Sequence, residues 1–216
     1  MQIVKGINIT NEDNMELMSR YKDNHFDLAI VDPPYGGKDA INVKYKDETK
    51  FKTKRTKYKE FKNIEPSKEY FQELIRVSKK QIIWGVNFYN NFNLSGGRIC
   101  WDKKGTAFGR GELAYYSHSK SVQIFEFAWN GMIQQEMHNK EKRIHPTQKP
   151  RQLYNWLLDN YAKPGDKILD THLGSGSIAI ACHERGFELT ACELDKEYFD
   201  SAIKRIKLET SQQSLF

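Results

Sequence analysis

Short apolar runs alternate with amphipathic segments along most of this chain. A short, largely apolar run is typical of a strand buried on both faces of a parallel sheet, and apolar residues three or four apart indicate a helix. We therefore predict one α/β domain with a single doubly wound, mostly parallel sheet that also carries an antiparallel strand pair. The predicted strands are residues 2–9, 26–31, 81–84, 98–101, 113–116, 123–127, 167–170 and 188–192, with 113–116 and 123–127 paired as a hairpin. The predicted helices carry their apolar stripes at residues 15–21, 70–75, 153–161, 178–185 and 198–206, and we expect the tail from 209 to fray.

One of these strands ends in a stiff turn, Asp32-Pro33-Pro34-Tyr35-Gly36. The carboxyl end of a strand is where open α/β sheets bind their ligands. Two consecutive prolines fix the backbone, so the Asp32 carboxylate and the Pro33 carbonyl form a fixed pair of acceptors beside the flat ring of Tyr35. This set suits a planar group that bears an NH2, such as a nucleobase. The simpler alternative is a strand exit with a proline stop.

A long basic segment follows this turn. Residues 38–68 contain eleven Lys or Arg and five acidic residues, so their charge of +6 equals the net charge of the whole chain. Aromatic residues are interleaved, and no helical or strand period is evident. Loops of this length in compact domains are functional or disordered, and we favour a clamp on nucleic-acid phosphates over a solvated insertion. The insertion covers 38–66, and the residues expected to contact phosphates are Lys52, Lys54, Arg55 and Lys57.

A second ligand-binding turn follows the predicted strand 167–170. Its sequence, DTHLGSGS at 170–177, opens a helix, and its two glycines allow a ligand to approach the backbone closely. Glu193 ends the next predicted strand and is placed to accept hydrogen bonds from ribose hydroxyls. The third glycine of the dinucleotide fingerprint is absent, which favours an adenosine ligand without a pyrophosphate. The plainer alternative is a tight turn with an unrelated surface glutamate.

Composition narrows the setting of the protein. A length of 216 residues suits one α/β domain, and a pI of about 9.0 suggests a polyanionic partner. Cys100, Cys182 and Cys192 form no CxxC pair and lie in or beside apolar runs, so we expect reduced thiols and no metal site. No signal-peptide or membrane-spanning pattern is evident, so we expect a cytoplasmic protein that does not enter membranes.

Three motifs, in this order, carry a resemblance to a known family. DPPY at 32–35, HPTQKP at 145–150 and DTHLGSGS at 170–177 resemble the motifs of beta-class DNA amino-methyltransferases, which use S-adenosylmethionine (AdoMet). The resemblance covers nearly the whole chain, so it implies one catalytic domain over 1–216 with a circularly permuted, Rossmann-like methyltransferase fold. The DPPY form is similar to that of the N6-adenine enzymes. Only the short segment 130–144 stands where the family carries a target-recognition domain.

The resemblance implies a catalytic set of Asp32, Pro33, Pro34 and Tyr35. Asp32 and the Pro33 carbonyl would draw both N–H bonds of the target amino group toward them and favour a pyramidal nitrogen whose lone pair points at the methyl group. Tyr35 would stack on a base extruded from the duplex. Catalysis would therefore consist of positioning and electrostatics, without a covalent enzyme intermediate.

The resemblance also implies an AdoMet pocket. Glu193 would hold the ribose, and Asp13 would approach the adenine of the cofactor. Two positions depart from the family pattern, because His172 replaces a phenylalanine and Glu12 replaces a glycine. The residues implied for cofactor binding are Asp13, Asp32, Thr147, Lys149, Pro150, Asp170, His172, Leu173, Gly174, Ser175, Gly176, Ser177 and Glu193, with Thr147 and Lys149 near the methionine end.

We therefore expect methyl transfer from AdoMet to the N6 amino group of adenine in DNA. One alternative is N4-cytosine methylation in DNA. Another is a catalytically idle AdoMet- and DNA-binding subunit that needs a partner, which the shortness of 130–144 favours and the intact set at 32–35 argues against. RNA remains a further alternative substrate because a basic loop recognises backbone charge. DNA is the expected partner, and the oligomeric state stays open, with a homodimer as one option.

Overall fold

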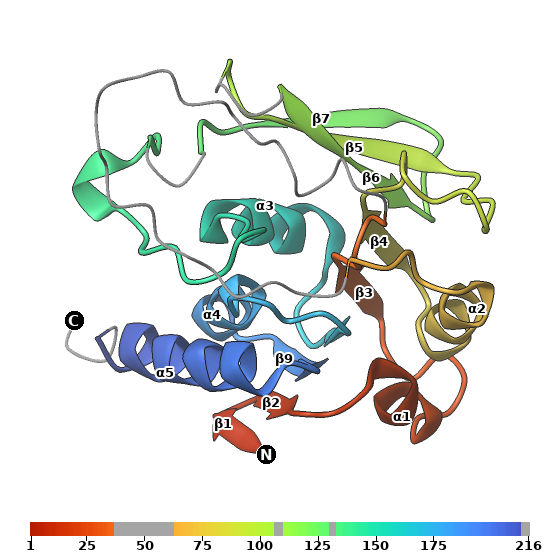
Figure 1. Ribbon diagram of the computed structural model, residues 1–216, viewed down its shortest axis with the longest axis horizontal. Helices are drawn as coiled ribbons and strands as arrows, with labels where there is room; N and C mark the ends of the chain where they lie inside the picture. Colours follow the sequence, from red (N-terminus) through yellow and green to blue (C-terminus); the bar gives the residue numbers. More distant parts are fainter. Residues whose placement is uncertain (37–62, 106–109, 130–132, 213–216) are drawn as a thin grey trace.

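The computed structural model describes residues 1–36, 63–105, 110–129 and 133–212. Within them, the strands form one nine-stranded sheet in the order β1-β2-β9-β8-β3-β4-β6-β5-β7 (Figure 1). The five strands from β2 to β4 in this order are parallel, whereas β6 is antiparallel to both of its neighbours. The predicted fold class, a mostly parallel α/β sheet, is confirmed. The strands are β1 (Gln2–Val4), β2 (Ile7–Thr10), β3 (Leu28–Val31), β4 (Gln81–Trp84), β5 (Gly97–Asp102), β6 (Gly111–Tyr116), β7 (Val122–Glu126), β8 (Lys167–Asp170) and β9 (Glu188–Cys192).

Helices cover both faces of this sheet (Figure 1). One core lies between the sheet and α3, α4 and α5, and a second lies between the sheet and α1 and α2. In the described part of the chain, no helix is both long and apolar enough to cross a membrane. The helices are α1 (Asn14–Ser19), α2 (Lys68–Val77), α3 (Arg151–Tyr161), α4 (Ser177–Arg185) and α5 (Lys196–Gln212), with a 3-10 turn η1 (Met137–Asn139).

Strand β3 shows why the central runs are wholly apolar. Leu28 and Ile30 lie in the core beneath α3–α5, whereas Ala29 and Val31 lie in the core beneath α1 and α2. All four residues are buried, so neither face of the strand tolerates a polar side chain. This burial fixes the position of the turn that follows at Asp32.

The predicted hairpin of 113–116 with 123–127 is wrong. Strand β5 lies between β6 and β7, pairing antiparallel with β6 and parallel with β7. The reason is burial, because Ile99 and Trp101 of β5 are fully buried whereas Val122 and Ile124 of β7 are each 62% exposed. The more buried strand takes the inner position and the more exposed strand takes the edge.

Both ends of the chain also differ from expectation. The predicted strand 2–9 is two antiparallel strands, because Gly6 adopts a positive φ of 77° and turns the chain between them. The expected fraying from 209 is wrong, since α5 continues to Gln212. Thr210 is buried, and the Glu209 carboxylate accepts from Arg205.

Candidate active site

Three adjacent strands bring the predicted site residues to one edge of the sheet. β8 lies between β3 and β9, and all three run parallel. Their carboxyl ends therefore carry Asp32, Asp170 and Glu193 side by side. This edge is the expected ligand site of a doubly wound sheet.

The turn after β3 presents its acceptors to hydroxyl groups. One oxygen of Asp32, Oδ1, accepts from the Tyr35 hydroxyl at 2.8 Å, and the Pro33 carbonyl accepts from the Tyr89 hydroxyl at 3.1 Å. The Tyr35 ring stacks on Phe88, with centroids 4.9 Å apart and planes 10° apart. The predicted acceptor pair and flat ring thus have partners of their own. Phe88 was missed in the sequence, although it lies in the Asn- and aromatic-rich segment that follows β4.

Lys149 lies at the centre of a buried charge cluster. Its Nζ is 2.5 Å from Asp32 Oδ2, 3.0 Å from Glu112 Oε2 and 3.1 Å from the Tyr35 hydroxyl. Only 3% of its side chain is exposed. Glu112 also binds Lys103, whose Nζ is 2.5 Å from Oε1. Sequence reasoning missed Glu112, because its charge at the start of a largely apolar strand is the only signal that marks it.

The cluster perturbs the pKa of both carboxyl groups. Burial raises the pKa of Asp32, and the ammonium of Lys149 opposes this rise. Burial also acts to raise the pKa of Glu112, but the ammoniums of Lys149 and Lys103 outweigh it and lower this pKa to about 2. Glu112 is therefore a carboxylate at neutral pH, and its negative charge further raises the pKa of Asp32.

The glycine-rich turn between β8 and α4 is fastened to Glu193. Its Oε2 accepts from the Gly174 backbone N–H at 2.9 Å, and its Oε1 accepts from the Asp195 N–H at 3.0 Å. Gly174 and Gly176 have φ of 53° and 77°, values that favour glycine. Burial raises the pKa of Glu193. Glu193 thus lies beside the glycine-rich turn, at the end of the neighbouring strand β9.

His172 lies between this turn and α1. Its Nε2 is 3.2 Å from the amide nitrogen of Asn14, and its Nδ1 is 3.0 Å from the Thr171 hydroxyl. An amide nitrogen only donates, so Nε2 accepts and the imidazole is neutral. Burial lowers the pKa of His172 to about 4. The backbone N–H of His172 donates to Asp170 Oδ1, and burial raises the pKa of Asp170 to about 8.

The remaining predicted residues hold the turns together. Ser177 donates to the Lys149 carbonyl at 2.9 Å and lies 3.1 Å from the Ser175 hydroxyl, which joins the turn at 174–177 to the segment before α3. The Thr147 hydroxyl is 3.1 Å from His145 Nδ1. Pro150 and Leu173 are buried beside them. Asp13 caps α1 by accepting from the Met15 N–H at 2.7 Å, next to the residue that contacts His172.

Several predicted features cannot be placed in the site described above. Lys52, Lys54, Arg55 and Lys57 lie outside the described residues, as do most of 38–66 and the first residues of 130–144. Within the described ranges, no group of three His, Cys, Asp or Glu side chains could hold a metal ion. Cys182 and Cys192 are buried free thiols, and Cys100 is partly buried.

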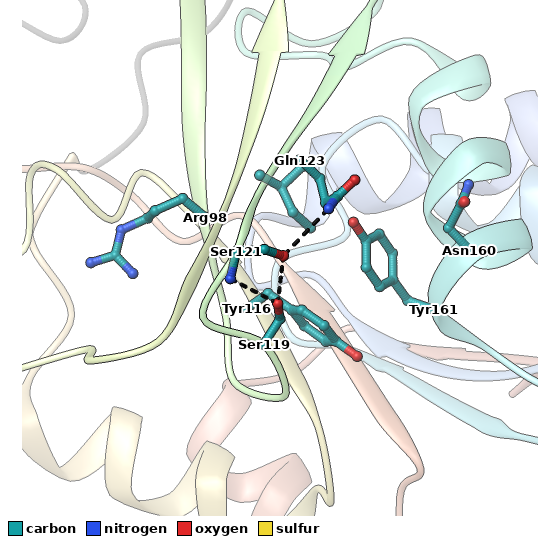
Figure 2. Close-up of a pocket in the computed structure, with 8 residues that line it drawn as sticks. Arg98, Tyr116, Ser119, Ser121, Gln123, Asn160 and Tyr161 are labelled. Carbon is teal, nitrogen blue, oxygen red and sulfur yellow. Dashed lines mark hydrogen bonds between the residues drawn. The ribbon is translucent and has the colours of Figure 1, made fainter.

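A separate hollow of about 330 Å³ lies where β5 and β7 begin, at the end of the strands opposite to the one that carries Asp32. Figure 2 shows Ser119, Ser121 and Gln123 bonded to one another there. Arg98 points away from them and donates to the carbonyls of Leu94, Gly96 and Gly97. Ser119, Ser121, Gln123 and Arg98 thus have local hydrogen-bond partners, and we place the candidate active site at the edge that carries Asp32.

Known proteins match this chain in sequence and in fold. A model of a DNA methylase family matches residues 39–204. The type II methyltransferase M2.DpnII of Streptococcus pneumoniae is 22% identical over 254 residues, covering 93% of this chain and 90% of that protein. The type II methyltransferase M.HpaI of Haemophilus parainfluenzae is 34% identical over 71 residues, covering 33% of this chain and 23% of that protein.

Two solved structures show the same fold. The crystal structure of the M1.HpyAVI–SAM complex has a TM-score of 0.56 at 19% identity, and the match covers 92% of this chain and 99% of that chain. The cytosine-N4-specific PvuII DNA methyltransferase has a TM-score of 0.55 at 13% identity, with 96% and 94% covered.

Proposed function

Since this chain belongs to the DNA methylase family and is thus a DNA amino-methyltransferase, we propose that it methylates the N6 amino group of adenine, with AdoMet as the methyl donor. The observation that supports this most is the position of Asp32 and Pro33 at the carboxyl end of β3, beside the glycine-rich turn of β8. In our proposal, the site for the amino group and the site for the nucleoside are therefore adjacent. The DPPY sequence favours adenine over cytosine by its resemblance to N6-adenine enzymes.

The chemistry of the second turn fits AdoMet. The Glu193 carboxylate accepts from the backbone N–H groups of Gly174 and Asp195 and keeps acceptor capacity for a ribose hydroxyl. Asp170 adds a buried carboxyl group, and a positively charged ligand beside it would favour its ionised form. Asp13, Thr147 and Leu173 line the neighbouring turns in our proposal. The structural neighbour M1.HpyAVI forms a complex with SAM, which agrees with this assignment.

The chain's own residues position the target amino group. When bound, AdoMet supplies an electrophilic methyl group: the amino nitrogen forms the new N–C bond, the S–C bond breaks with its electron pair left on sulfur, and the nitrogen loses one proton. Asp32 and the Pro33 carbonyl accept from the two N–H groups, which opposes delocalisation of the lone pair into the ring. Asp32 can take the departing proton because burial raises its pKa.

Aromatic residues receive the extruded base. Tyr35 and Phe88 form a parallel stack, and Phe88 is 40% exposed. We assign this pair as the surface on which an adenine stacks, which offsets part of the cost of leaving the duplex. In our proposal, the basic segment 38–66 holds the DNA backbone. The cytoplasm remains the location that we propose for the protein.

Nucleoside analysis tests this proposal directly. The purified chain is incubated with AdoMet and unmodified genomic DNA, the DNA is digested to nucleosides, and methylated products are identified by mass spectrometry. We expect N6-methyladenine. N4-methylcytosine would assign the alternative specificity, which the fold permits because the PvuII neighbour is cytosine-N4-specific. No methylated base would favour an idle subunit that needs a partner.

A further inference from the structure

The Lys149 ammonium has three N–H donors, and each has an acceptor inside the protein. They are Asp32 Oδ2, Glu112 Oε2 and the Tyr35 hydroxyl. Since only 3% of the Lys149 side chain is exposed, water cannot replace these partners. Any movement of Asp32 therefore changes the stability of a buried charge.

This arrangement conflicts with the role proposed for Asp32. Its Oδ1 accepts from Tyr35 and its Oδ2 accepts from Lys149, so a target amino group must share an oxygen that already binds another donor. Two donors on one oxygen weaken each other's bonds, so a target amino group on Oδ2 weakens the bond between Lys149 and Asp32. A buried ammonium that loses its carboxylate partner is costly, so Lys149 needs a second partner throughout the reaction.

Glu112 supplies this second partner. It lies near the start of β6, opposite Trp101 of β5, and reaches Lys149 with Oε2 while its Oε1 is held by Lys103. Two ammoniums and two carboxylates thus alternate as Lys103, Glu112, Lys149 and Asp32. The lysine at the outer end fixes Glu112 independently of Asp32.

Building on the proposed function, we infer that Glu112 is a positioning residue of the methyl-transfer site. It shares the Lys149 ammonium with Asp32 and so allows Asp32 Oδ2 to turn toward the target amino group while Lys149 keeps a charged partner. In the variant Glu112→Gln, Lys149 retains one carboxylate, Asp32, and holds it more tightly. The Asp32 carboxylate is then a poorer acceptor for the target.

The test compares Glu112→Gln with Glu126→Gln, a matched control whose side chain is 58% exposed and pairs with Lys104 on the surface. We expect Glu112→Gln to lower kcat for DNA methylation by about tenfold or more. AdoMet affinity, measured by calorimetry, should stay within about twofold of wild type, and the control should match wild type. Glu112→Asp keeps the charge and should recover part of the lost kcat.

The pH profile of kcat separates this role from a merely structural one. Glu112 raises the pKa of Asp32, so its replacement by Gln should move the acidic limb of the profile to lower pH. Among the described residues, Lys149, Tyr35, Tyr70, Tyr89, Tyr154 and Asp170 also interact electrostatically with Asp32, and all are retained in the variant. The difference between the two pH profiles therefore measures the effect of the Glu112 charge on Asp32.

An unchanged kcat and an unmoved acidic limb in Glu112→Gln, with an active wild type, would overturn this inference alone. If Glu112→Gln does not fold, Glu112→Asp decides: a kcat below wild type with an unmoved acidic limb supports the inference, and wild-type kcat overturns it. An inactive wild-type chain would overturn the proposed function and this inference together.

Discussion

His172 makes the folded protein sensitive to acid. Its imidazole is buried and neutral, and its pKa of about 4 lies below the ordinary value of 6.5. The unfolded chain therefore binds this proton more readily than the folded chain, so stability is complete above pH 6.5 and is lost as the pH falls toward 4. The full contribution to the free energy of unfolding is about 3 kcal/mol, of which about 2 kcal/mol is lost between pH 7 and pH 5.

The variant His172→Phe should remove this part of the pH dependence. Phenylalanine is the residue of the family pattern and carries no titratable group. It also loses the contacts to Asn14 and Thr171, but that cost is the same at both pH values and cancels in the difference. Burial also lowers the pKa of His145 to about 4, and this residue contributes equally to the pH dependence of both proteins.

Urea unfolding at pH 7 and pH 5 measures the difference. The loss of unfolding free energy between these pH values should be about 2 kcal/mol smaller in His172→Phe than in wild type. His118→Gln, a change at an exposed histidine, serves as the control and should lose as much as wild type. Equal losses in wild type and His172→Phe would refute the argument that His172 is held neutral by burial.

Two further changes test the cofactor site and the basic segment. Glu193→Ala should weaken AdoMet binding by about 1–3 kcal/mol, because it removes charge-assisted hydrogen bonds and the anchor of Gly174, and unaltered affinity in titration calorimetry would exclude Glu193 from the site. Neutralising the phosphate-contact candidates should flatten the slope of log DNA affinity against log salt by up to about 3–4 and leave AdoMet affinity alone, whereas superimposable slopes would exclude the clamp. These candidates are Lys52, Lys54, Arg55 and Lys57.

Much of the fold follows from local sequence pattern. β4, β8 and β9 begin and end at the predicted residues, since each is a short, largely apolar run. Ser67, a residue type typical of helix N-caps, caps α2, and its hydroxyl accepts from the Tyr70 N–H. The order of β5, β6 and β7 in the sheet could not be predicted from local sequence pattern, because it depends on how much of each strand the rest of the molecule buries.

The candidate site, too, could be predicted from the sequence only in part. The rule that ligands bind at the carboxyl ends of parallel strands predicted that Asp32 and Glu193 lie at one edge of the sheet, because this depends on strand direction alone. The contacts among Asp32, Glu112 and Lys149 could not be predicted, since Lys149 is 117 residues from Asp32 in sequence and the contact depends on tertiary packing. The family resemblance implied only that Lys149 lies near the cofactor, and the structure adds the contact between its ammonium and Asp32.

The central claim is that Asp32 holds the amino group that receives the methyl group. Its replacement in Asp32→Ala should leave the fold intact, because Lys149 keeps Glu112 as a partner. The decisive measurement is the initial rate of methyl incorporation into unmodified DNA, for wild type and Asp32→Ala at saturating AdoMet. We predict a loss of about 100-fold or more with an unchanged far-UV circular dichroism spectrum. A folded Asp32→Ala variant that methylates DNA near the wild-type rate would contradict the account.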